Sequence, residues 1–295
     1  MKKVVALLLA GLLCFALVGC QTDKKDEPQF EPLPVTGNLE VAVLQIGKAD
    51  AIVVTTQNKT MVIDTGESDD GGKVLNYLNE KGITSVDYML ITHYDRDHVG
   101  GADRLLNFVE VKEVIRPDYV GVREEYDTFL ASMSELEVKD TALKPGSANM
   151  TFMMDDVEVT INVPMKDTYV DADGVQLDNN FSLVVRLRHG TKLLLFAGDC
   201  EDMRLAELVT GDQNWRAHFL KVPYHGNYTQ LTTSFLGKVL PEYAVICDSD
   251  KNPAAAETLS VLTGLDAQVY QTKNGTVICQ SDGKNLTVTQ LPGEE

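Results

Sequence analysis

Two histidines and two aspartates fall close together in residues 92–101, which read Thr-His-Tyr-Asp-Arg-Asp-His-Val-Gly-Gly. Imidazole and carboxylate groups are the ligands of borderline metal ions such as Zn²⁺, Mn²⁺ and Fe²⁺. Four such ligands are too many for one tetrahedral ion that must keep an open position, so the spacing favours two metal ions. His93 and Asp95 would reach one ion, and Asp97 and His98 would reach the other.

The alternative interpretation of this segment is a solvated polar loop with two histidines by chance. The chain has only five histidines among its 295 residues. Two of them in this pattern, directly after an apolar run, argue against chance, although every motif match carries a risk of a false positive.

The apolar pattern around the segment predicts the elements that position it. Residues 87–92 are apolar and partly β-forming, which predicts a buried strand. Gly100-Gly101 and the apolar-periodic residues 102–109 predict a turn and then a helix. We therefore expect the four side chains on a loop at the end of a rigid strand, where functional groups usually lie.

Three further apolar runs end in a residue type that binds metal ions. They end at Asp64, Asp199 and His225. An aspartate at a strand end is usually a cap or turn residue, so each signal is weak by itself. Together they support the metal-site hypothesis, because every such run ends in a possible ligand.

Strand-like and helix-like segments follow one another in two series along the chain. The first series has strand-like runs at 39–46, 51–56, 60–64, 87–92 and 111–115, with helical patterns at 71–81, 102–109 and 123–137. The second has strand-like runs at 151–154, 157–163, 182–187, 192–197, 218–222, 243–247, 268–270, 276–280 and 286–290, with helical patterns at 201–210, 232–239 and 254–263. A β-rich and then α pattern thus appears twice, which predicts an α/β fold of two mixed β-sheets packed face to face with helices outside. This is a four-layer αββα sandwich.

The N-terminus has the pattern of a targeting segment. Lys2 and Lys3 precede the apolar residues 4–18, and Leu-Val-Gly-Cys ending at Cys20 resembles a bacterial lipobox. The resemblance implies that residues 1–19 are a lipoprotein signal peptide and that Cys20 carries diacylglycerol on its sulfur. An uncleaved anchor is the alternative. In both cases we expect a cell-membrane protein on the extracytoplasmic face.

Residues 20–36 are expected to be the lipid anchor and a disordered tether. The segment is rich in Lys, Asp, Glu and Pro, and Pro28, Pro32 and Pro34 prevent regular helix or sheet. Residues 37–295 suit one large domain or two fused halves.

The net charge of −18 limits the partners that this chain can bind. So acidic a protein is repelled by anionic membrane surfaces and by the backbone of long nucleic acids. The sequence has no basic cluster, so we expect no stable binding of duplex nucleic acid. The sequence does not indicate an oligomeric state.

Three cysteines remain in the body of the chain, an odd number without CxxC spacing: Cys200, Cys247 and Cys279. Cys247 and Cys279 lie on apolar strand-like runs, which favours buried thiols. A disulfide between these two is the alternative, since an exported location permits one.

The order Asp-Thr-Gly, His-x-Asp-x-Asp-His-x-Gly-Gly, Gly-Asp and His-Gly resembles the metallo-β-lactamase superfamily of metallohydrolases. With Asp95 in the position of the second histidine, it resembles the metallohydrolase domain of ComEC-type competence proteins and choline-phosphate esterases. Flanking stretches at 44–52, 179–183 and 220–226 support this resemblance, which covers roughly residues 39–288. It implies that residues 37–295 form a hydrolase domain of the metallo-β-lactamase fold.

The resemblance also implies a set of six metal ligands. His93 and Asp95 would hold one ion, and Asp199 would bridge it to a second ion. The second ion would have three further ligands: Asp97, His98 and His225.

Other roles implied by the resemblance concern residues around the ions. Asp64 would orient a ligand, and Asn180 would contact the substrate. Tyr224 stands where relatives have the first histidine of His-His-Gly, so a ligand or substrate contact is lost, or a phenol is supplied. Residues 250–253 lack a histidine that many ComEC-type relatives carry. Both departures affect the reaction more than the metal site.

Two metal ions about 3.5–4 Å apart can share a hydroxide and lower its pKa toward 7. That hydroxide would attack phosphorus or a carbonyl carbon, with Asp97 orienting the nucleophile. Tyr224 or Asn180 would donate to the substrate oxyanion. We expect Zn²⁺, with Mn²⁺ or Fe²⁺ as alternatives, because three carboxylates make the site harder.

The leading hypothesis is a membrane-anchored dimetal hydrolase of phosphoesters, most of all phosphodiesters. Candidate substrates are nucleic acid, nucleotides and choline-phosphate or teichoic-type esters. One alternative is a surface lipoprotein that binds metal ions or a ligand without catalysis. A weaker alternative is β-lactam hydrolysis, which Asp95 disfavours because a histidine is typical of those lactamases.

Overall fold

The structure is a computed structural model and describes residues 31–293. The predicted signal peptide, the predicted lipidation site Cys20 and residues 21–30 of the predicted tether lie outside the described residues. Residues 31–36 have no regular secondary structure. Within residues 31–293, no helix is long and apolar enough to cross a membrane.

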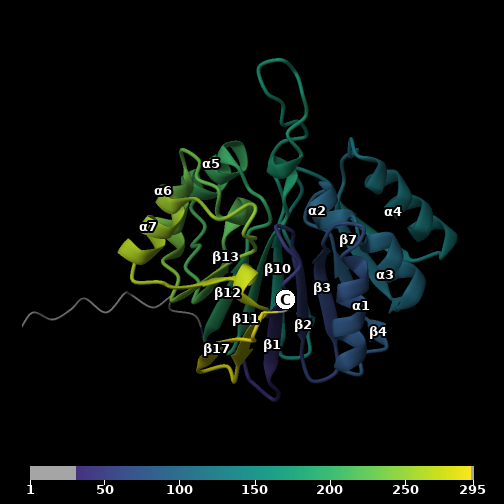
Figure 1. Ribbon diagram of the computed structural model, residues 1–295, viewed down its shortest axis with the longest axis horizontal. Helices are drawn as coiled ribbons and strands as arrows, with labels where there is room; N and C mark the ends of the chain where they lie inside the picture. Colours follow the sequence, from purple (N-terminus) through teal and green to yellow (C-terminus); the bar gives the residue numbers. More distant parts are fainter. Residues whose placement is uncertain (1–30, 294–295) are drawn as a thin grey trace, which may run out of the picture. The chain divides into compact units, whose positions relative to one another are not determined.

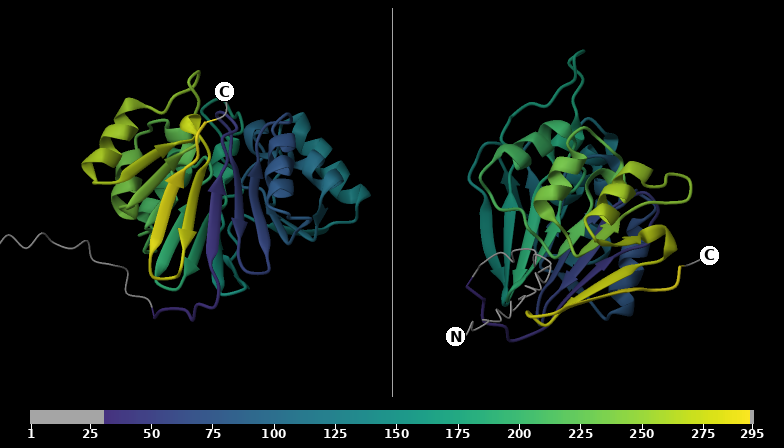
Figure 2. Two further views of the ribbon diagram at one scale, coloured as in Figure 1. Left: turned by 60° about the horizontal axis from the view of Figure 1, so that its bottom comes forward. Right: turned by 90° about the vertical axis from the view of Figure 1, so that its left-hand side faces the viewer.

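The first sheet has eight strands in the order β17-β16-β1-β2-β3-β5-β7-β8. Their bounds are β1 Leu39–Val43, β2 Ala51–Thr55, β3 Thr60–Thr65, β5 Tyr88–Leu90, β7 Glu113–Pro117, β8 Lys139–Leu143, β16 Val277–Ser281 and β17 Leu286–Gln290. The sheet is mixed, because β17 through β3 pair antiparallel and β3 through β8 pair parallel. The C-terminal hairpin β16–β17 thus lies beside the N-terminal strand β1 (Figure 2). A separate two-stranded pair joins β4 Ser85–Val86 to β6 Glu110–Val111.

The second sheet has seven strands in the order β15-β14-β13-β12-β11-β10-β9. Their bounds are β9 Met150–Met154, β10 Val157–Asn162, β11 Val184–His189, β12 Lys192–Phe196, β13 Phe219–Lys221, β14 Tyr243–Ile246 and β15 Gln268–Gln271. β9 through β12 pair antiparallel, and β12 through β15 pair parallel. Both sheets therefore have a parallel part, whose carboxyl ends can carry functional side chains.

Helices cover the outer faces of the two sheets, which completes four layers (Figure 1). The first sheet is covered by α1 Gly71–Glu80, α3 Ala102–Phe108 and α4 Glu124–Glu135, and the second by α5 Asp202–Thr210, α6 Thr232–Val239 and α7 Ala256–Gly264. Short helical turns also occur: α2 Arg96–Val99, η1 Asp178–Phe181, η2 Pro223–Gly226 and η3 Thr272–Asn274. The predicted αββα sandwich is confirmed.

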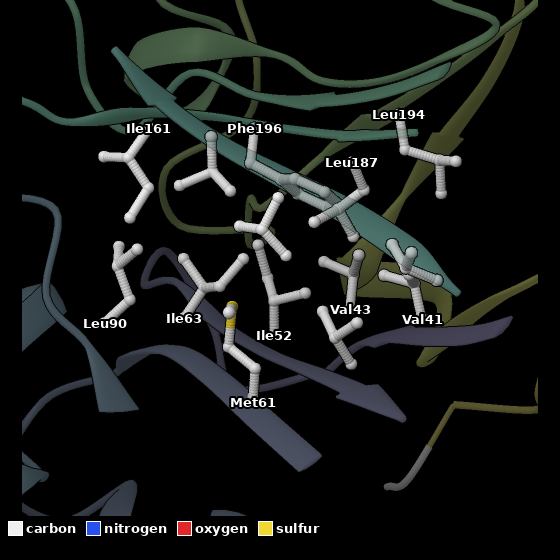
Figure 3. Close-up of a cluster of buried hydrophobic side chains, with 14 of the residues drawn as sticks. Val41, Val43, Ile52, Met61, Ile63, Leu90, Ile161, Leu187, Leu194 and Phe196 are labelled. Atoms are coloured by element: carbon white, nitrogen blue, oxygen red, sulfur yellow. The ribbon is translucent and has the colours of Figure 1, made fainter. Parts of the chain in front are cut away.

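The strand pattern explains why the layers hold together. Along β2, Ile52 and Val54 point into the core between the sheets, whereas Ala51 and Val53 point toward the helices. This period of two follows from the pleat of a strand. Because both faces are covered, the strand is a continuous apolar run rather than an alternating one. In the core between the sheets, Ile52 lies opposite Phe196 (Figure 3).

Local predictions differ from the structure at three places. The predicted strand 111–115 is divided at Lys112 into β6 and β7. Strand β8 was not predicted, because it is an edge strand with mostly polar residues and one buried side chain, Leu143. The interpretation of 93–98 as a loop is wrong for its second half, since Arg96–Val99 forms the helical turn α2.

We expect Phe196→Ala to lower the free energy of unfolding by about 3–5 kcal/mol, because the ring is fully buried between the sheets. Urea unfolding followed by circular dichroism measures the change. Phe108→Ala is the matched control, since this ring is 74% exposed and its loss should change stability by less than about 0.5 kcal/mol. Equal losses in the two variants would contradict the assignment of the core.

Candidate metal centre

Asp64 connects the end of β3 to the segment that follows β5. One of its carboxylate oxygens accepts a hydrogen bond from the backbone N–H of Thr92 at 2.7 Å. The other accepts from the Thr92 hydroxyl at 2.7 Å and lies 2.8 Å from Nδ1 of His98. Asp64 has a positive φ of 56°, a conformation that aspartate tolerates better than most residues. The strand end therefore orients His98, a predicted ligand, through Asp64.

Three imidazoles from different elements converge at this point. The ring centroids of His93 and His98 are 4.1 Å apart, and those of His98 and His225 are 5.5 Å apart. All three side chains are buried. His93 follows β5, His98 lies on α2, and His225 lies on the turn η2 after β13.

In each of the three imidazoles, Nδ1 has a hydrogen-bond partner and Nε2 points into the cluster without one of regular geometry. Nδ1 of His225 is 2.9 Å from the carbonyl oxygen of Cys247, and Nδ1 of His93 is 3.1 Å from the hydroxyl of Thr92. Nδ1 of His98 faces Asp64. The three Nε2 atoms are buried, and none makes a hydrogen bond of regular geometry. Because buried polar atoms normally have partners, these atoms fit the donor set of a metal centre, where imidazole ligands are oriented through their other nitrogen.

The three predicted carboxylate ligands lie beside these Nε2 atoms. Oδ2 of Asp199 is 2.9 Å from Nε2 of His225 and 3.4 Å from Nε2 of His98. Oδ2 of Asp97 is 3.3 Å from Nε2 of His225, and Oδ2 of Asp95 is 3.8 Å from Nε2 of His93. The structure thus brings all six predicted ligands into one region, with Asp199 in its interior. Three of them, His98, Asp199 and His225, form with Asp50 a buried cluster that is compatible with binding a divalent metal ion.

Two charged residues of this cluster, Asp50 and Lys221, were not predicted. Both are fully buried, and their carboxylate and ammonium groups form an ion pair. Nζ of Lys221 also donates to the carbonyl oxygen of Gly198 at 2.9 Å and lies 3.2 Å from Oδ1 of Asp199. Possible ligand atoms of Asp50, His98, Asp199 and His225 all lie within 4.8 Å of one another. The available signal was a lysine inside the apolar run 219–223, because lysine is almost never fully buried unless it is paired.

Gly198 permits the close approach that Asp199 requires. It has a positive φ of 50°, and a Cβ at this position would lie 2.9 Å from Oγ and 3.0 Å from Cβ of Ser182. The backbone N–H of Asp199 donates to that hydroxyl at 3.1 Å. A side chain at position 198 would therefore displace the strand end that carries Asp199.

The charges of the cluster shift the pKa values of its members. Burial alone would raise the pKa of Asp199, but His225, His98 and Lys221 hold it well below its usual range. Burial alone would lower the pKa values of His98 and His225, but the carboxylate of Asp199, among others, raises both. The pKa of His93 is lowered by burial and by the charge of His98. Without metal ions, protons on His98 and His225 therefore compensate part of the buried negative charge.

Asn180 and Tyr224 were predicted to contact substrate, and the structure gives them different surroundings. Asn180 is buried, and its side-chain oxygen accepts from the backbone N–H of Arg204 at 2.9 Å in the first turn of α5. Tyr224 is partly buried with a positive φ of 52°. Burial and the neighbouring carboxylate of Glu201 raise the pKa of Tyr224 to about 12. The Tyr224 hydroxyl thus stays protonated at neutral pH and remains a possible hydrogen-bond donor.

A pocket of about 700 Å³ opens over the carboxylates of Asp95 and Asp97. Lys48, Arg123 and Asn252 also line it. A smaller pocket of about 140 Å³ adjoins Asp95 and Arg123 on another side and includes Glu201. A separate pocket of about 700 Å³, which includes Leu39 and Ser281, contains none of the candidate ligands. We regard the pocket over Asp95 and Asp97 as the entrance to the centre, because it is the one of the two larger pockets that predicted ligands line.

The profile of the Metallo-beta-lactamase superfamily matches residues 45–169, which contain four of the six predicted ligands. The chain carries a metallo-β-lactamase superfamily domain. Members of this superfamily are generally metal-dependent hydrolases. The YhfI protein of Bacillus subtilis, whose crystal structure has the metallo-β-lactamase fold, superposes with a TM-score of 0.51 at 11% sequence identity, covering 82% of this chain and 100% of that chain.

The curated relatives of this metallo-β-lactamase domain are ComEC-type proteins. ComE operon protein 3 of Bacillus subtilis is 26% identical over 260 residues, covering 81% of this chain and 32% of that protein. Competence protein ComA of Neisseria gonorrhoeae is 27% identical over 211 residues, covering 70% of this chain and 26% of that protein. The chain therefore spans about a third or less of the length of these relatives.

Of the predictions on the cysteines, lipid attachment and location, the structure tests only the first. Cys200, Cys247 and Cys279 are all free and buried, which confirms the prediction of buried thiols. Lipid attachment and the extracytoplasmic location stay predictions.

We expect the affinity for Zn²⁺ to fall as the pH is lowered, because imidazole must lose its proton to bind a metal ion. His98 and His225 have raised pKa values, so proton release on binding should extend above their ordinary pKa of 6.5. Isothermal titration calorimetry in buffers of different ionisation enthalpy measures both quantities. Binding that is independent of pH would contradict the prediction.

In the metal-free protein, the raised pKa values of His98 and His225 stabilise the fold at acidic pH. This contribution to stability is lost as the pH rises through the raised pKa values.

We expect Lys221→Met to lower the free energy of unfolding by about 3–5 kcal/mol, because it leaves Asp50 and Asp199 buried without their cation. Adding Asp50→Asn should cost less than the sum of the single changes, with a coupling of about 1–3 kcal/mol. Urea unfolding of the metal-free protein measures this cycle. Lys139→Met removes an exposed ion pair with Glu113 and is the control, with an expected change within about 1 kcal/mol. Strict additivity of Lys221→Met and Asp50→Asn would refute the buried pair.

Proposed function

We propose that this protein hydrolyses phosphoesters, and phosphodiesters above all, with two divalent metal ions. One observation carries the proposal: three buried Nε2 atoms without a hydrogen bond of regular geometry converge with the carboxylates of Asp95, Asp97 and Asp199. His93 and Asp95 would hold one ion, and the remaining ligands would hold the other, with Asp199 between them. Zn²⁺ suits the imidazoles, and the three carboxylates make Mn²⁺ or Fe²⁺ the alternatives.

When bound, two such ions would supply a water molecule of lowered pKa and positive charge beside the reacting group. The residues of the chain would orient the ligands and contact the substrate. Asp64 and the carbonyl of Cys247 hold two imidazoles in the orientation that leaves Nε2 free. Lys221 keeps Asp199 ionised and in place. Tyr224 is protonated at neutral pH, so it can donate a hydrogen bond to a substrate oxygen.

The substrate class rests on the motif and on the relatives. Aspartate at position 95 departs from the histidine typical of β-lactam hydrolases, which favours a phosphoester over a lactam. Competence protein ComA and ComE operon protein 3 are both competence proteins of the ComEC type. This relationship supports a phosphodiester of nucleic acid or a nucleotide as the substrate. A choline-phosphate ester is the other candidate. The net charge of −18 favours a small or exposed ester over a long duplex.

The location is also part of the proposal. The pattern ending at Cys20 supports a lipoprotein anchored in the cell membrane with its body on the extracytoplasmic face. The three cysteines of the body are free thiols in the structure, so the fold does not depend on a disulfide at that location.

We expect the purified protein, loaded with Zn²⁺ or Mn²⁺, to hydrolyse at least one ester of a panel of bis-p-nitrophenyl phosphate, single-stranded DNA and p-nitrophenyl phosphorylcholine. Release of p-nitrophenol or of nucleotides measures the rate. His93→Ala and Asp199→Ala should lower the rate by at least about a hundredfold, because each removes a ligand.

The same panel separates the alternatives. About two metal ions per chain with no turnover above the His93→Ala and Asp199→Ala controls would favour a binding protein without catalysis. Turnover of nitrocefin without turnover of any phosphoester would favour β-lactam hydrolysis. Either outcome would overturn the proposed function.

A further inference from the structure

Two basic side chains stand at the entrance of the metal centre. Nζ of Lys48 lies 3.4 Å from Oδ2 of Asp97, and Nε of Arg123 lies 3.4 Å from Oδ1 of Asp95. Lys48 comes from the segment between β1 and β2, and Arg123 directly precedes α4. Both line the pocket of about 700 Å³ over the two carboxylates.

Lys48 and Arg123 differ in their partners from Arg96, the third cation of this entrance. Arg96 also lines the pocket, but it pairs with Glu67 at 3.5 Å. Within residues 31–293, the ion-pair partners of Lys48 and Arg123 are the predicted metal ligands themselves, and Arg123 also attracts the more distant carboxylate of Asp178. Both contacts are long, and the side chains are 30% and 56% exposed. Pairs of this kind are weak, so stability does not explain the position of the two cations.

The charge balance of a loaded centre gives the two cations another role. The carboxylates of Asp95, Asp97 and Asp199 would offset most of the charge of two divalent ions, and a hydroxide would offset the remainder. Asp95 and Asp97 would then no longer need a cationic side chain. Lys48 would be left facing the pocket without an ion-pair partner, and Arg123 would keep only the attraction of Asp178, in a protein whose net charge of −18 repels anions.

We propose that Lys48, supported by Arg123, binds a non-bridging oxygen of the substrate phosphate and makes the site selective for anionic phosphoesters. Lysine binds phosphate as a mobile point charge, and the planar guanidinium can donate two parallel hydrogen bonds. This inference rests on the proposed function, because it assigns the substrate group at the same centre.

The acidic residues of the pocket limit the negative charge that a substrate phosphate can carry. Glu67 is paired with Arg96, and Asp70 is paired with Lys73 at 3.0 Å. Asp69 also lines the pocket and has no ion pair among those of residues 31–293. A phosphodiester, with one negative charge per phosphate, therefore suits this entrance better than a polyphosphate or a phosphomonoester dianion.

We test the inference with Lys48→Met, Lys48→Arg and Arg123→Met, and with Lys139→Met as the matched control on the distant strand β8. Steady-state kinetics with bis-p-nitrophenyl phosphate separates KM from kcat. Calorimetric titration of the metal-loaded protein with inorganic phosphate measures anion binding without turnover. Elemental analysis gives the metal content per chain for every variant.

For Lys48→Met we expect KM and the dissociation constant for phosphate to rise about tenfold or more, since a hydrogen bond to a charged group is lost. The value of kcat should stay within about threefold, and the metal content should be unchanged. Lys48→Arg should restore most of the phosphate affinity, Arg123→Met should show a smaller loss, and Lys139→Met should behave as the unchanged protein does.

Two results would overturn the inference while leaving the proposed function intact. One is equal KM and phosphate affinity in Lys48→Met and Lys139→Met. The other is a loss of metal from Lys48→Met, which would show that Lys48 acts on Asp97 and not on substrate. Conversely, phosphate binding that depends on Lys48 in a protein that hydrolyses no ester would support the anion site and refute the proposed function.

Discussion

The buried carboxylate of Asp199 is the group on which the arrangement of the centre depends. A carboxylate removed from water needs compensating charge or hydrogen bonds. Lys221 supplies a permanent cation at 3.2 Å, and His225 and His98 face the other oxygen. Lys221 in turn needs Asp50 as a second partner, because an ammonium group fully buried beside one shared carboxylate would be poorly compensated. The cluster is therefore a set of mutually dependent charges, and metal ions would take over the part that protons carry in their absence.

The two-sheet architecture explains how these charges come together. Asp64 lies at the end of β3 and His93 follows β5, and these strands are parallel neighbours in the first sheet. Asp199 and His225 follow β12 and β13, which are parallel neighbours in the second. Because the carboxyl ends of parallel neighbours lie at one edge, each sheet presents two polar residues there. Packing the sheets face to face, with an apolar core between them (Figure 3), places these two edges against each other.

Much of this arrangement could be predicted from the sequence, for reasons that differ by residue. Strands buried on both faces, such as β3, are continuous apolar runs, and the polar residue after them stands out in the sequence. The six proposed ligands were found because they follow such runs or lie in one dense motif. Strand β8 could not be found in this way, because an edge strand needs few apolar residues. The one-turn helix α2 is too short for a periodic pattern, so His98 and Asp97 were expected on a loop.

Asp50 and Lys221 show a different limit. Their importance comes from pairing across two segments that are far apart in the chain, and no local pattern records a partner. Lys221 interrupts an apolar run, which marks it as unusual but does not say which carboxylate it meets. Tyr224 has the same limit: its place in the motif was visible, whereas the effect of Glu201 on its hydroxyl depends on the fold.

The ligands divide into an interior group and a rim group with different physical support. His93, His98, His225 and Asp199 are buried, and they are held by hydrogen bonds or ion pairs from Thr92, Asp64, the Cys247 carbonyl and Lys221. Asp95 and Asp97 are partly exposed, and long ion pairs to solvent-accessible cations are their contacts at the entrance. Pre-organised ligands lose little freedom on binding, whereas mobile ligands must be ordered. The interior group thus provides the rigid part of the centre, and the rim group is the part that can exchange a protein cation for a metal ion and a substrate anion.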